Sequence, residues 1–388
     1  MGDPNLYQPK SLAATTYAID AWIPDQTRMT GVQKYALQLI QAMKRQSLSE
    51  GERVVLFSFQ PLVGSLAELP TGWEERVLAW RPQRGWMSVR VSWELLRRPP
   101  TVFFVPAQGL PIVSARLTVT TVHDIAFERR PDLYDPSVAR RLRRVTKAAV
   151  KKATKIIVPS EATKQDMIDI YRVASDRITV TPLSADTTRF RPLEQAQIDS
   201  VLQKYRLGRN FFLSVGRLER KKNITTLLRA FESFKERRGV GDPFELVLAG
   251  TPGYGYYEIK KYLEFSDVKE SIRTLGFVPE EDLPAILNAA TAYVFPSWYE
   301  GFGIPNVEAM ASGTPLITSD IPPHREVVGD AALLVSAREP DAWAAAMTRI
   351  AQDGTLRDEL SRKGIKRAKD FSWDKTAQQT WAVLRSLV

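Results

Sequence analysis

The sequence predicts an α/β protein with two domains, each built on a doubly wound parallel sheet. Three observations support this prediction. The chain has 388 residues, about twice what one ordinary core accommodates. Short β-rich runs alternate with longer amphipathic stretches throughout its length. Several of the short runs are apolar at every position, as expected for parallel strands that helices cover on both faces.

The same alternation of elements recurs in both halves of the chain. In the first half the amphipathic stretches include 31–44 and 138–152, and the strand candidates are Tyr17–Asp20, Arg53–Phe57, Thr101–Val105, Leu117–Val122, Lys155–Pro159 and Ile178–Val180. In the second half the strand candidates are Phe211–Val215, Phe244–Ala249, Ser271–Leu275, Ala292–Phe295 and Pro315–Thr318. The chain from Pro182 to Asn210 is rich in turn formers and proline, so it is the predicted linker. We expect two Rossmann-like domains that face a cleft.

Composition excludes several classes of protein. Apolar residues make up 44% of the chain and charged residues 25%, the balance of a soluble globular protein. No run approaches the roughly 18 apolar residues of a membrane span, and no signal-peptide pattern opens the chain, so a cytoplasmic location is expected. The absence of cysteine excludes disulfides, thiolate zinc sites and a cysteine nucleophile. With two histidines, His123 and His324, a His-rich metal centre is excluded too.

The net charge of +10 is concentrated in the first half. Residues 1–190 contain 27 Lys/Arg and 18 Asp/Glu, whereas residues 191–388 contain 27 and 26. Residues 140–155 hold eight cations and no acid, and six of the cations share one helical arc: Arg140, Arg143, Arg144, Lys147, Lys151 and Lys155. Because like charges at i,i+4 repel and no acid in this stretch relieves the repulsion, the arc predicts an anionic partner. An anionic membrane surface fits such a face.

The first candidate binding segment is Ser214–Asn223, which follows an apolar strand and opens a helix. A strand that leads into a helix N-terminus presents free backbone N–H groups at the carboxyl edge of the sheet. Arg217 and Lys222 add cations beside these groups, which is a way to hold a diphosphate without metal. An ordinary basic turn is the alternative interpretation.

The second candidate segment is Phe295–Glu308, between a strand and a short helix predicted from about Pro305 to Ser312. Gly301 and Gly303 leave the backbone bare just before that helix, so an anion or a sugar can approach its amides closely. Glu300 ends the preceding loop and Glu308 lies about one turn into the helix. Both carboxylates can therefore face the same crevice and bind vicinal hydroxyls.

These segments together resemble the family-4 retaining glycosyltransferases of the GT-B fold. Seven residues separate Glu300 from Glu308, with GFG-x-P between them and VGR-x₄-KN upstream. Other stretches are similar to family motifs in order and spacing: Tyr17–Ala21, Thr30–Tyr35, Val119–Asp124, Val158–Lys164, Gly276–Val278 and Phe371–Trp373. The resemblance implies an acceptor-side domain at 1–190, a domain for the nucleotide sugar at 191–370, and a closing helix at 371–388 that crosses back to the first domain.

The resemblance also implies roles for the matched positions. Arg217 and Lys222 would hold the donor diphosphate, Glu308 the ribose diol and Glu300 the sugar hydroxyls. His123 would lie near the reacting sugar, so the implied catalytic residues are His123, Glu300, Arg217 and Lys222. The implied donor-binding residues are Gly31, Arg217, Lys222, Phe277, Val278, Gly301, Phe302, Gly303, Ile304 and Glu308. The loop 25–31 departs from the family pattern, with a single glycine where the family has a pair. His324, in a proline-rich turn, is expected to be structural.

No D-x-D sequence occurs, so transfer is expected to need neither a metal nor a cofactor other than the nucleoside-diphosphate sugar. Lysine and arginine cations and helix amides would stabilise the charge on the leaving diphosphate. Retention is implied by the resemblance. Since no carboxylate can be placed as a nucleophile, the hypothesis is a front-face reaction in which a diphosphate oxygen deprotonates the acceptor.

The leading hypothesis is a retaining hexosyltransferase of cell-surface polysaccharide synthesis, peripheral on the inner face of the cell membrane. Its acceptor would be a glycan or a polyprenyl-diphosphate-linked sugar. The stretch Ser319–Val335 resembles O-antigen mannosyltransferases and favours GDP-mannose as donor, with a UDP-sugar as the alternative. A sugar-nucleotide epimerase would need more acid/base groups than one histidine supplies. A basic nucleic-acid-binding protein is the alternative from another class, but aromatic-interleaved basic motifs are missing, and no nucleic acid is expected.

Overall fold

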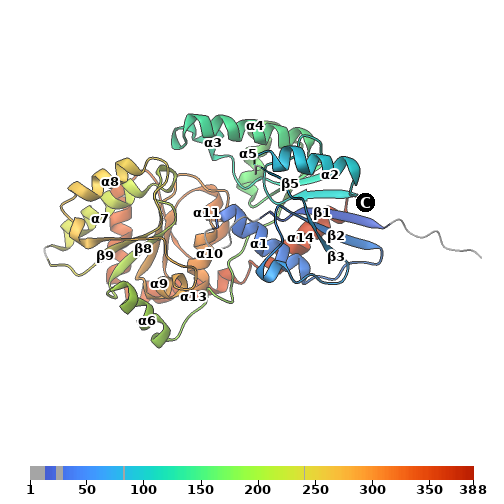
Figure 1. Ribbon diagram of the computed structural model, residues 1–388. Coiled ribbons are helices and arrows are strands. Elements are labelled where there is room, and N and C mark those ends of the chain that lie inside the picture. The colour runs from blue at the N-terminus through green and yellow to red at the C-terminus, as the bar shows by residue number, and fades with distance from the viewer. Residues whose placement is uncertain (1–13, 23–28, 82–83, 240) are drawn as a thin grey trace, which may run out of the picture. The chain divides into compact units, whose positions relative to one another are not determined.

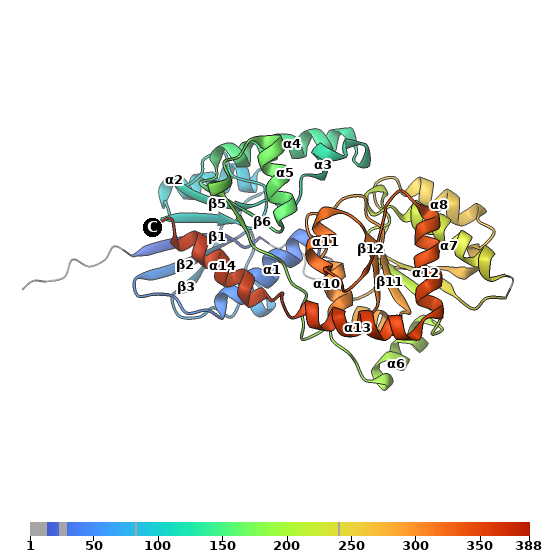
Figure 2. The same cartoon turned by 180° about the vertical axis from the view of Figure 1, so that it is seen from behind.

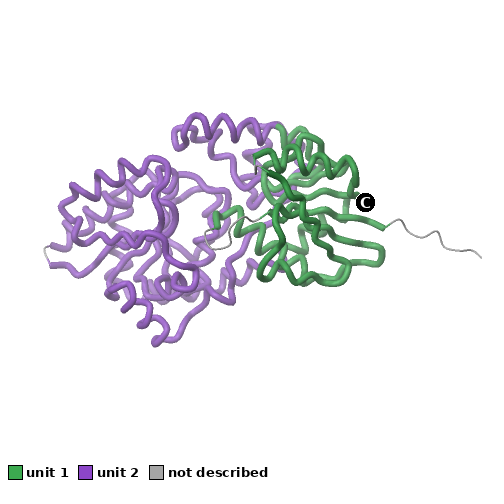
Figure 3. Tube along the Cα trace, in the orientation of Figure 1, with its two compact units in different colours: residues 1–121, 148–156, 377–388 green, residues 122–147, 157–376 purple. Residues whose placement is uncertain are grey.

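The computed structural model describes residues 14–22, 29–81, 84–239 and 241–388. Two parallel β-sheets with helices packed around them confirm the predicted α/β class (Figure 1). Contacts divide the chain into two compact units, residues 1–121, 148–156 and 377–388, and residues 122–147 and 157–376 (Figure 3). The first sheet ends at Val180 and the second begins at Phe211, so the predicted boundary at residue 190 falls between the sheets.

The first sheet has seven strands in the order β3-β2-β1-β4-β5-β6-β7. They are β1 (Thr15–Asp20), β2 (Glu52–Ser58), β3 (Trp73–Val77), β4 (Val102–Val105), β5 (Leu117–Thr121), β6 (Lys155–Val158) and β7 (Ile178–Val180). Tyr17 of β1 lies opposite Val54 of β2 and Val102 of β4. The sequence does not predict β3, because this edge strand reads Trp-Glu-Glu-Arg-Val and lacks a continuous apolar run.

Helical segments connect the strands of this sheet. They are α1 (Gly31–Lys44), η1 (Gly64–Leu66), η2 (Trp86–Val91), α2 (Ser92–Arg97), α3 (Ala126–Arg129), η3 (Pro131–Leu133), α4 (Pro136–Lys152), α5 (Glu161–Tyr171) and η4 (Ser175–Arg177). In α1, Thr30 and Gln33 form a reciprocal capping box, which satisfies backbone donors at the start of the helix. The observed bounds of α1 are those of the predicted amphipathic stretch, and its apolar face is buried.

The last helix, α14 (Trp373–Arg385), packs on the first sheet, which confirms the predicted crossing (Figure 2). Trp381 meets the rings of Tyr17 and Trp73 edge to face, with centroids 5.3 and 6.2 Å away. Arg385 donates to Glu52 of β2 at 2.7 Å. These aromatic contacts and the ion pair fix the end of the chain against β1, β2 and β3.

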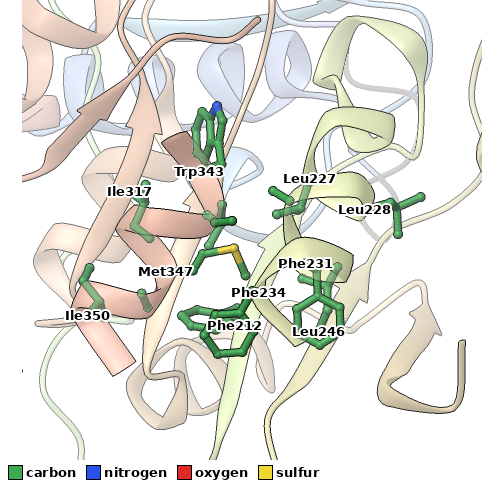
Figure 4. Close-up of a cluster of buried hydrophobic side chains, with 14 of the residues drawn as sticks. Phe212, Leu227, Leu228, Phe231, Phe234, Leu246, Ile317, Trp343, Met347 and Ile350 are labelled. Atoms are coloured by element: carbon green, nitrogen blue, oxygen red, sulfur yellow. The ribbon is translucent and has the colours of Figure 1, made fainter. Parts of the chain in front are cut away.

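The second sheet has six strands in the order β10-β9-β8-β11-β12-β13. They are β8 (Phe211–Val215), β9 (Glu245–Ala249), β10 (Ile272–Gly276), β11 (Ala292–Phe295), β12 (Leu316–Ser319) and β13 (Leu333–Val335). The helical segments are α6 (Gln195–Tyr205), η5 (Arg220–Lys222), α7 (Ile224–Arg238), α8 (Tyr256–Phe265), η6 (Lys269–Ser271), α9 (Leu283–Ala289), α10 (Ile304–Ala311), α11 (Pro322–Val328), α12 (Pro340–Gln352) and α13 (Gly354–Ala368). The core that supports this sheet joins α7 to α12, with Leu227 and Phe231 on one helix and Trp343 and Met347 on the other (Figure 4).

The structure corrects the predicted linker, because α6 occupies residues 195–205 of the stretch 182–210. Ile198 and Leu202 lie four residues apart and are buried, as on one face of an amphipathic helix. Only the parts before Gln195 and after Tyr205 are irregular. The short edge strand β13 is also missing from the prediction, since three residues give little periodicity.

Candidate functional site

Topology brings the two candidate segments to one edge of the second sheet. The strand order reverses at β8, whose neighbours are β9 and β11, and ligands of open α/β sheets bind outside the carboxyl ends of strands at such a switch point. The segment after β8 and the segment after β11 are tied together by backbone and side chain. Trp298 N–H donates to the carbonyl of Lys221 at 3.0 Å, and Asn223 Nδ2 donates to that of Pro296 at 3.0 Å.

Lys222 and Glu300 form an ion pair at this edge. Lys222 Nζ lies 2.6 Å from Glu300 Oε1 and 4.8 Å from the centroid of the Phe295 ring. Burial alone would raise the pKa of Glu300, but Lys222 and then Lys221 outweigh it and lower this pKa to about 2. Glu300 is therefore a carboxylate throughout the neutral range. Its partner is Lys222, the lysine that is predicted from the sequence to bind the donor diphosphate.

A second ion pair joins Lys221 to Asp124, which follows His123. Lys221 Nζ lies 3.0 Å from Asp124 Oδ2. Burial alone would lower the pKa of Lys221, but Asp124 and Glu300 outweigh it and hold this pKa well above its ordinary value. Lys221 and Asp124 are not among the predicted site residues. A run of three cations, Arg220-Lys221-Lys222, does not show which side chain turns inward, and so it does not show which acid that side chain pairs with.

The glycine loop after Glu300 packs against the segment that carries His123. A Cβ on Gly301 would lie 1.8 Å from the His123 carbonyl oxygen, so only glycine fits there. The carbonyl of Gly301 accepts from Ser160 Oγ at 2.6 Å and from Thr163 Oγ1 at 3.2 Å. His123 is thereby placed beside the loop that holds Glu300, as the two sequence motifs require if they serve one site.

The loop then enters α10, and buried polar groups lie beneath it. Gly303 has φ +98°, and a Cβ there would lie 3.1 Å from Asn306 Nδ2 and 3.2 Å from His324 Nε2. Phe302 is buried and meets the ring of Phe371 edge to face at 5.6 Å. Within the described residues, neither the Asn306 amide nor His324 Nε2 has a hydrogen-bond partner. The floor of the glycine loop is therefore polar.

His324 is neutral and its tautomer follows from its neighbours. It is fully buried and stacks on Phe295 at 5.2 Å, and burial lowers its pKa to about 4. The hydroxyls of Thr318 and Ser319 donate to backbone carbonyls, so the 2.8 Å contact of His324 Nδ1 with Thr318 Oγ1 assigns the proton to Nδ1. Nε2 is then a bare acceptor beside Gly303. His324 is therefore buried, as a structural residue would be, but it lies directly beside the glycine loop of the candidate site.

Besides burial, the carboxylates of Glu300 and Glu308 both raise the pKa of the Tyr293 hydroxyl. Glu308 is buried in the second turn of α10. Burial first, and then Glu308 and Glu300, raise the pKa of Tyr293 well above its ordinary value. The Tyr293 hydroxyl donates to the carbonyl of Val215, the last residue of β8, at 3.2 Å. Both acids are therefore grouped around the carboxyl ends of β8 and β11.

Other predicted site residues lie outside this group. Arg217 follows β8, and its side chain is 62% exposed, with Nε 3.8 Å from Glu219 Oε2. Phe277 and Val278 follow β10, two strands away from β8, and Phe277 is exposed. Gly31 begins α1 in the first unit and is exposed. Residues 25–28 of its loop, where the family pattern is broken, lie outside the described residues.

Of the six cations predicted to share one helical arc, five lie on α4, and Lys155 is instead the first residue of β6, because the helix ends at Lys152. Arg140, Arg144, Lys147 and Lys151 are exposed. Arg143 is half-buried, and it donates to Glu128 at 2.9 Å and to the carbonyl of Phe127 at 2.9 Å. Glu128 lies outside the stretch 140–155, so the inference that no acid relieves the repulsion is wrong at this position. We call Arg140, Arg144, Lys147 and Lys151, the exposed cations of the predicted arc on α4, the basic face.

Within the described residues, none of the helices is both long and apolar enough to span a membrane. In the same residues, no three His, Asp or Glu side chains gather as a metal-binding group.

Comparisons with known proteins match both halves. Residues 29–189 match the model for "Glycosyltransferase Family 4" and residues 198–367 that for "Glycosyl transferases group 1". "O-antigen chain mannosyltransferase B" of Escherichia coli is 32% identical over 75% of this chain and 76% of its own length. "O-antigen chain mannosyltransferase RfbU" of Salmonella typhimurium is 29% identical over 74% of each chain. The crystal structure of Anabaena Alr3699/HepE in complex with UDP-glucose has a TM-score of 0.74 at 17% identity, covering 96% of this chain and 99% of that one.

Proposed function

Because the chain belongs to the family-4 glycosyltransferases of the GT-B fold, we propose that it transfers mannose from GDP-mannose, with retention, to a glycan or polyprenyl-diphosphate-linked acceptor. The names of two relatives support mannose as the sugar. The observation that carries the proposal is the Lys222–Glu300 pair beside the glycine loop at the switch point of the sheet. The alternative donor is a UDP-sugar, since a structural neighbour was solved with UDP-glucose.

The described side chains suit a bound nucleotide sugar. The N-terminal end of α10, next to Gly303, presents backbone N–H groups to an anion, and Lys222 and Arg217 supply cations for the diphosphate. Glu308 would accept from the ribose hydroxyls. Glu300, ionised and fixed, would accept from the sugar hydroxyls, and the loop from Gly301 to Ile304 would line the sugar. Phe277 and Val278 would contact the base, and Gly31 the phosphates.

In the proposed reaction the bond between the anomeric carbon and the diphosphate oxygen breaks, and the acceptor oxygen bonds to that carbon on the same face. The acceptor proton passes to the leaving diphosphate oxygen. Lys222 and Arg217 stabilise the negative charge that develops there, which is worth several kcal/mol in a site that excludes water. His123, placed by the Gly301 contact, would lie beside the reacting sugar.

The direct test is calorimetry with GDP and UDP, followed by donor hydrolysis with GDP-mannose and UDP-glucose. We expect GDP to bind more tightly. Arg217→Ala should weaken GDP binding at least about tenfold, because a charge-assisted contact contributes about 1.5–3 kcal/mol. Arg229→Ala, which removes an exposed arginine of α7, is the control and should bind like the wild type. Tighter UDP binding would select the alternative donor, and no binding of either nucleotide would reject the function.

Substitution of Glu308 should affect nucleotide binding, whereas substitution of Glu300 should affect turnover. Glu308→Gln should weaken binding of free nucleoside diphosphate, because it weakens the acceptor of the ribose diol. Glu300→Gln should spare that binding while transfer falls, since free nucleotide carries no sugar for it to hold. Titration calorimetry and initial rates of transfer measure the two effects. Equal loss of nucleotide affinity in both variants would contradict this division of roles.

Metal independence has its own test. Transfer should continue in excess EDTA, because cationic side chains and α10 amides would stabilise the leaving diphosphate. The measurement is the initial rate before and after chelation, with Mg²⁺ or Mn²⁺ then added back. A complete loss that either metal restores would overturn this part of the proposal.

The basic face of α4 is proposed to dock on the anionic inner leaflet of the cell membrane, where a lipid-linked acceptor would lie. Each cation near such a surface contributes about 1 kcal/mol. Replacing Arg140, Arg144, Lys147 and Lys151 by Glu should abolish flotation with phosphatidylglycerol vesicles and spare transfer to a soluble acceptor. Folding should survive, since these side chains are exposed, at a few tenths of a kcal/mol each. Unchanged flotation would show that the basic face does not dock.

A further inference from the structure

Four large apolar side chains are exposed close together in the first unit. Val89, within η2, and Trp93 and Leu96, on α2, are spaced i, i+4 and i+7, and are 47%, 56% and 61% exposed. This spacing places them on one side of a continuous helical segment. Ile112, in the loop before β5, is 67% exposed. We call Val89, Trp93, Leu96 and Ile112 the apolar stripe.

The loop of Ile112 is held against the helical segment and against the end of α4. Val113 N–H donates to Ser92 Oγ at 3.0 Å, and Ser92 Oγ donates to the Ser88 carbonyl at 2.6 Å. Lys152 Nζ donates to the carbonyls of Pro111 and Ile112, at 2.8 and 2.7 Å. These bonds fix Ile112 beside the helical segment, so the stripe is a preformed surface and not a set of unrelated exposed residues.

Cationic side chains lie close to the apolar stripe along the chain: Arg97 and Arg98 directly follow Leu96, Arg116 is four residues after Ile112, and Lys151 precedes the lysine that bonds the Ile112 carbonyl. Arg97, Arg98, Arg116 and Lys151 are exposed. Glu94, the acid within α2, is only 5% exposed and forms ion pairs with Arg90 at 3.0 Å and Arg76 at 3.4 Å. A stripe of Trp, Leu, Ile and Val bordered by arginine and lysine is complementary to an anionic lipid interface, where the rings and chains enter the acyl boundary and the cations meet phosphates.

We propose that the apolar stripe inserts into the interfacial region of an anionic phospholipid membrane and anchors the first unit there. The inference rests on the membrane partner proposed for α4 and adds to it an apolar contact that salt does not screen. Electrostatic docking alone brings the protein to the surface. Insertion of the stripe would retain it there and bring Trp93 into contact with acyl chains.

The test uses full-length protein and vesicles of phosphatidylglycerol and phosphatidylcholine. Insertion predicts that brominated acyl chains quench Trp93, read as the difference between wild type and Trp93→Phe, since the chain holds nine tryptophans. It also predicts that part of the flotation persists in 1 M salt, where the screening length is about 3 Å. Replacing all four residues of the stripe by Ser should lower vesicle affinity at least about tenfold.

A matched control removes apolar groups elsewhere. Tyr257 and Phe265 of α8 are 77% and 76% exposed, and the variant Tyr257→Ser/Phe265→Ser should float like the wild type. If the fourfold variant fails to fold by circular dichroism, the single variant Leu96→Glu replaces it, with the same expected direction of effect.

The outcomes separate this inference from those on which it rests. If wild-type protein ignores anionic vesicles at low salt, the docking of α4 and the insertion both fail, whereas transfer to a soluble acceptor still tests the glycosyltransferase. If wild type floats but Trp93 is not quenched and the fourfold variant floats equally, only the insertion is overturned. If the wild type is a dimer that the fourfold variant turns into a monomer, the stripe is covered by a second copy and the insertion is wrong.

Discussion

Gly301→Ala should reduce the rate of sugar transfer about a hundredfold, since displacement of a site by about 1 Å costs that much. The added Cβ would lie 1.8 Å from the His123 carbonyl oxygen and 3.1 Å from Asp124 Cβ. The loop cannot yield freely, because Ser160 and Thr163 hold the Gly301 carbonyl. Either Glu300 or His123 must therefore move from its place. The measurement is kcat with a soluble acceptor, together with the thermal midpoint.

Gly208→Ala is the control for this substitution. A Cβ on Gly208 meets no atom within 4 Å, so the same chemical change should leave both transfer and stability near those of the wild type. In Gly301→Ala the thermal midpoint should fall as well, but unfolding should remain cooperative. If Gly301→Ala keeps full activity, the contact between His123 and the glycine loop has no part in the reacting arrangement.

Local patterns account for the parts of the fold that the sequence predicts. The bounds of α1 follow from a capping box and an apolar periodicity that lie within the helix itself. Strands β8 and β11 are recognisable because central parallel strands are apolar at nearly every position, with Ser214 the exception in β8. Edge strands lack this signal, so β3 and β13 are missed. The helix α6 is missed because the prolines and turn formers just before it outweigh the helical spacing of its two buried residues, Ile198 and Leu202.

The side-chain partners within the site cannot be predicted in this way. Lys222 and Glu300 are 78 residues apart, and Lys221 and Asp124 are 97 apart. Motif spacing predicts that these segments meet at one edge of the sheet, but it does not say which cation faces which acid. That choice depends on the turn of η5 and on the register of the loop after β11. For the same reason His324 reads as structural in the sequence and lies beneath Gly303 in the fold.

Lys222→Ala should destabilise the second unit by about 3 kcal/mol, because it leaves Glu300 buried without its nearest cation. The pKa of Glu300 should rise from about 2 once Lys222 no longer favours the carboxylate. Adding Glu300→Gln to this variant should restore part of the loss, since a neutral amide costs less to bury. Urea unfolding of the wild type, the two single variants and the double variant measures these differences at neutral pH.

Lys363→Ala is the control, because it removes a lysine that forms ion pairs on the surface instead of in a buried site. Lys363 bridges Glu359 and Asp330 at 2.8 and 3.0 Å on the surface, where solvent screens the charges, so its loss should change the unfolding free energy far less than the loss of Lys222. A loss in Lys222→Ala as small as the loss in Lys363→Ala would show that the buried pair contributes no more than an exposed one.

Acid should lower the free energy of unfolding by protonating Glu300. Its pKa lies near 2 in the folded protein and near 4.5 when unperturbed, so ionised Glu300 stabilises the fold fully above pH 4.5 and loses that effect as the pH falls through 2. The shift corresponds to about 3 kcal/mol. Glu300→Gln lacks this titration. The difference in unfolding free energy between wild type and Glu300→Gln should therefore be constant above about pH 5 and shift against the wild type below it. A difference that stays constant down to pH 2 would show that Lys222 does not hold Glu300 as a carboxylate.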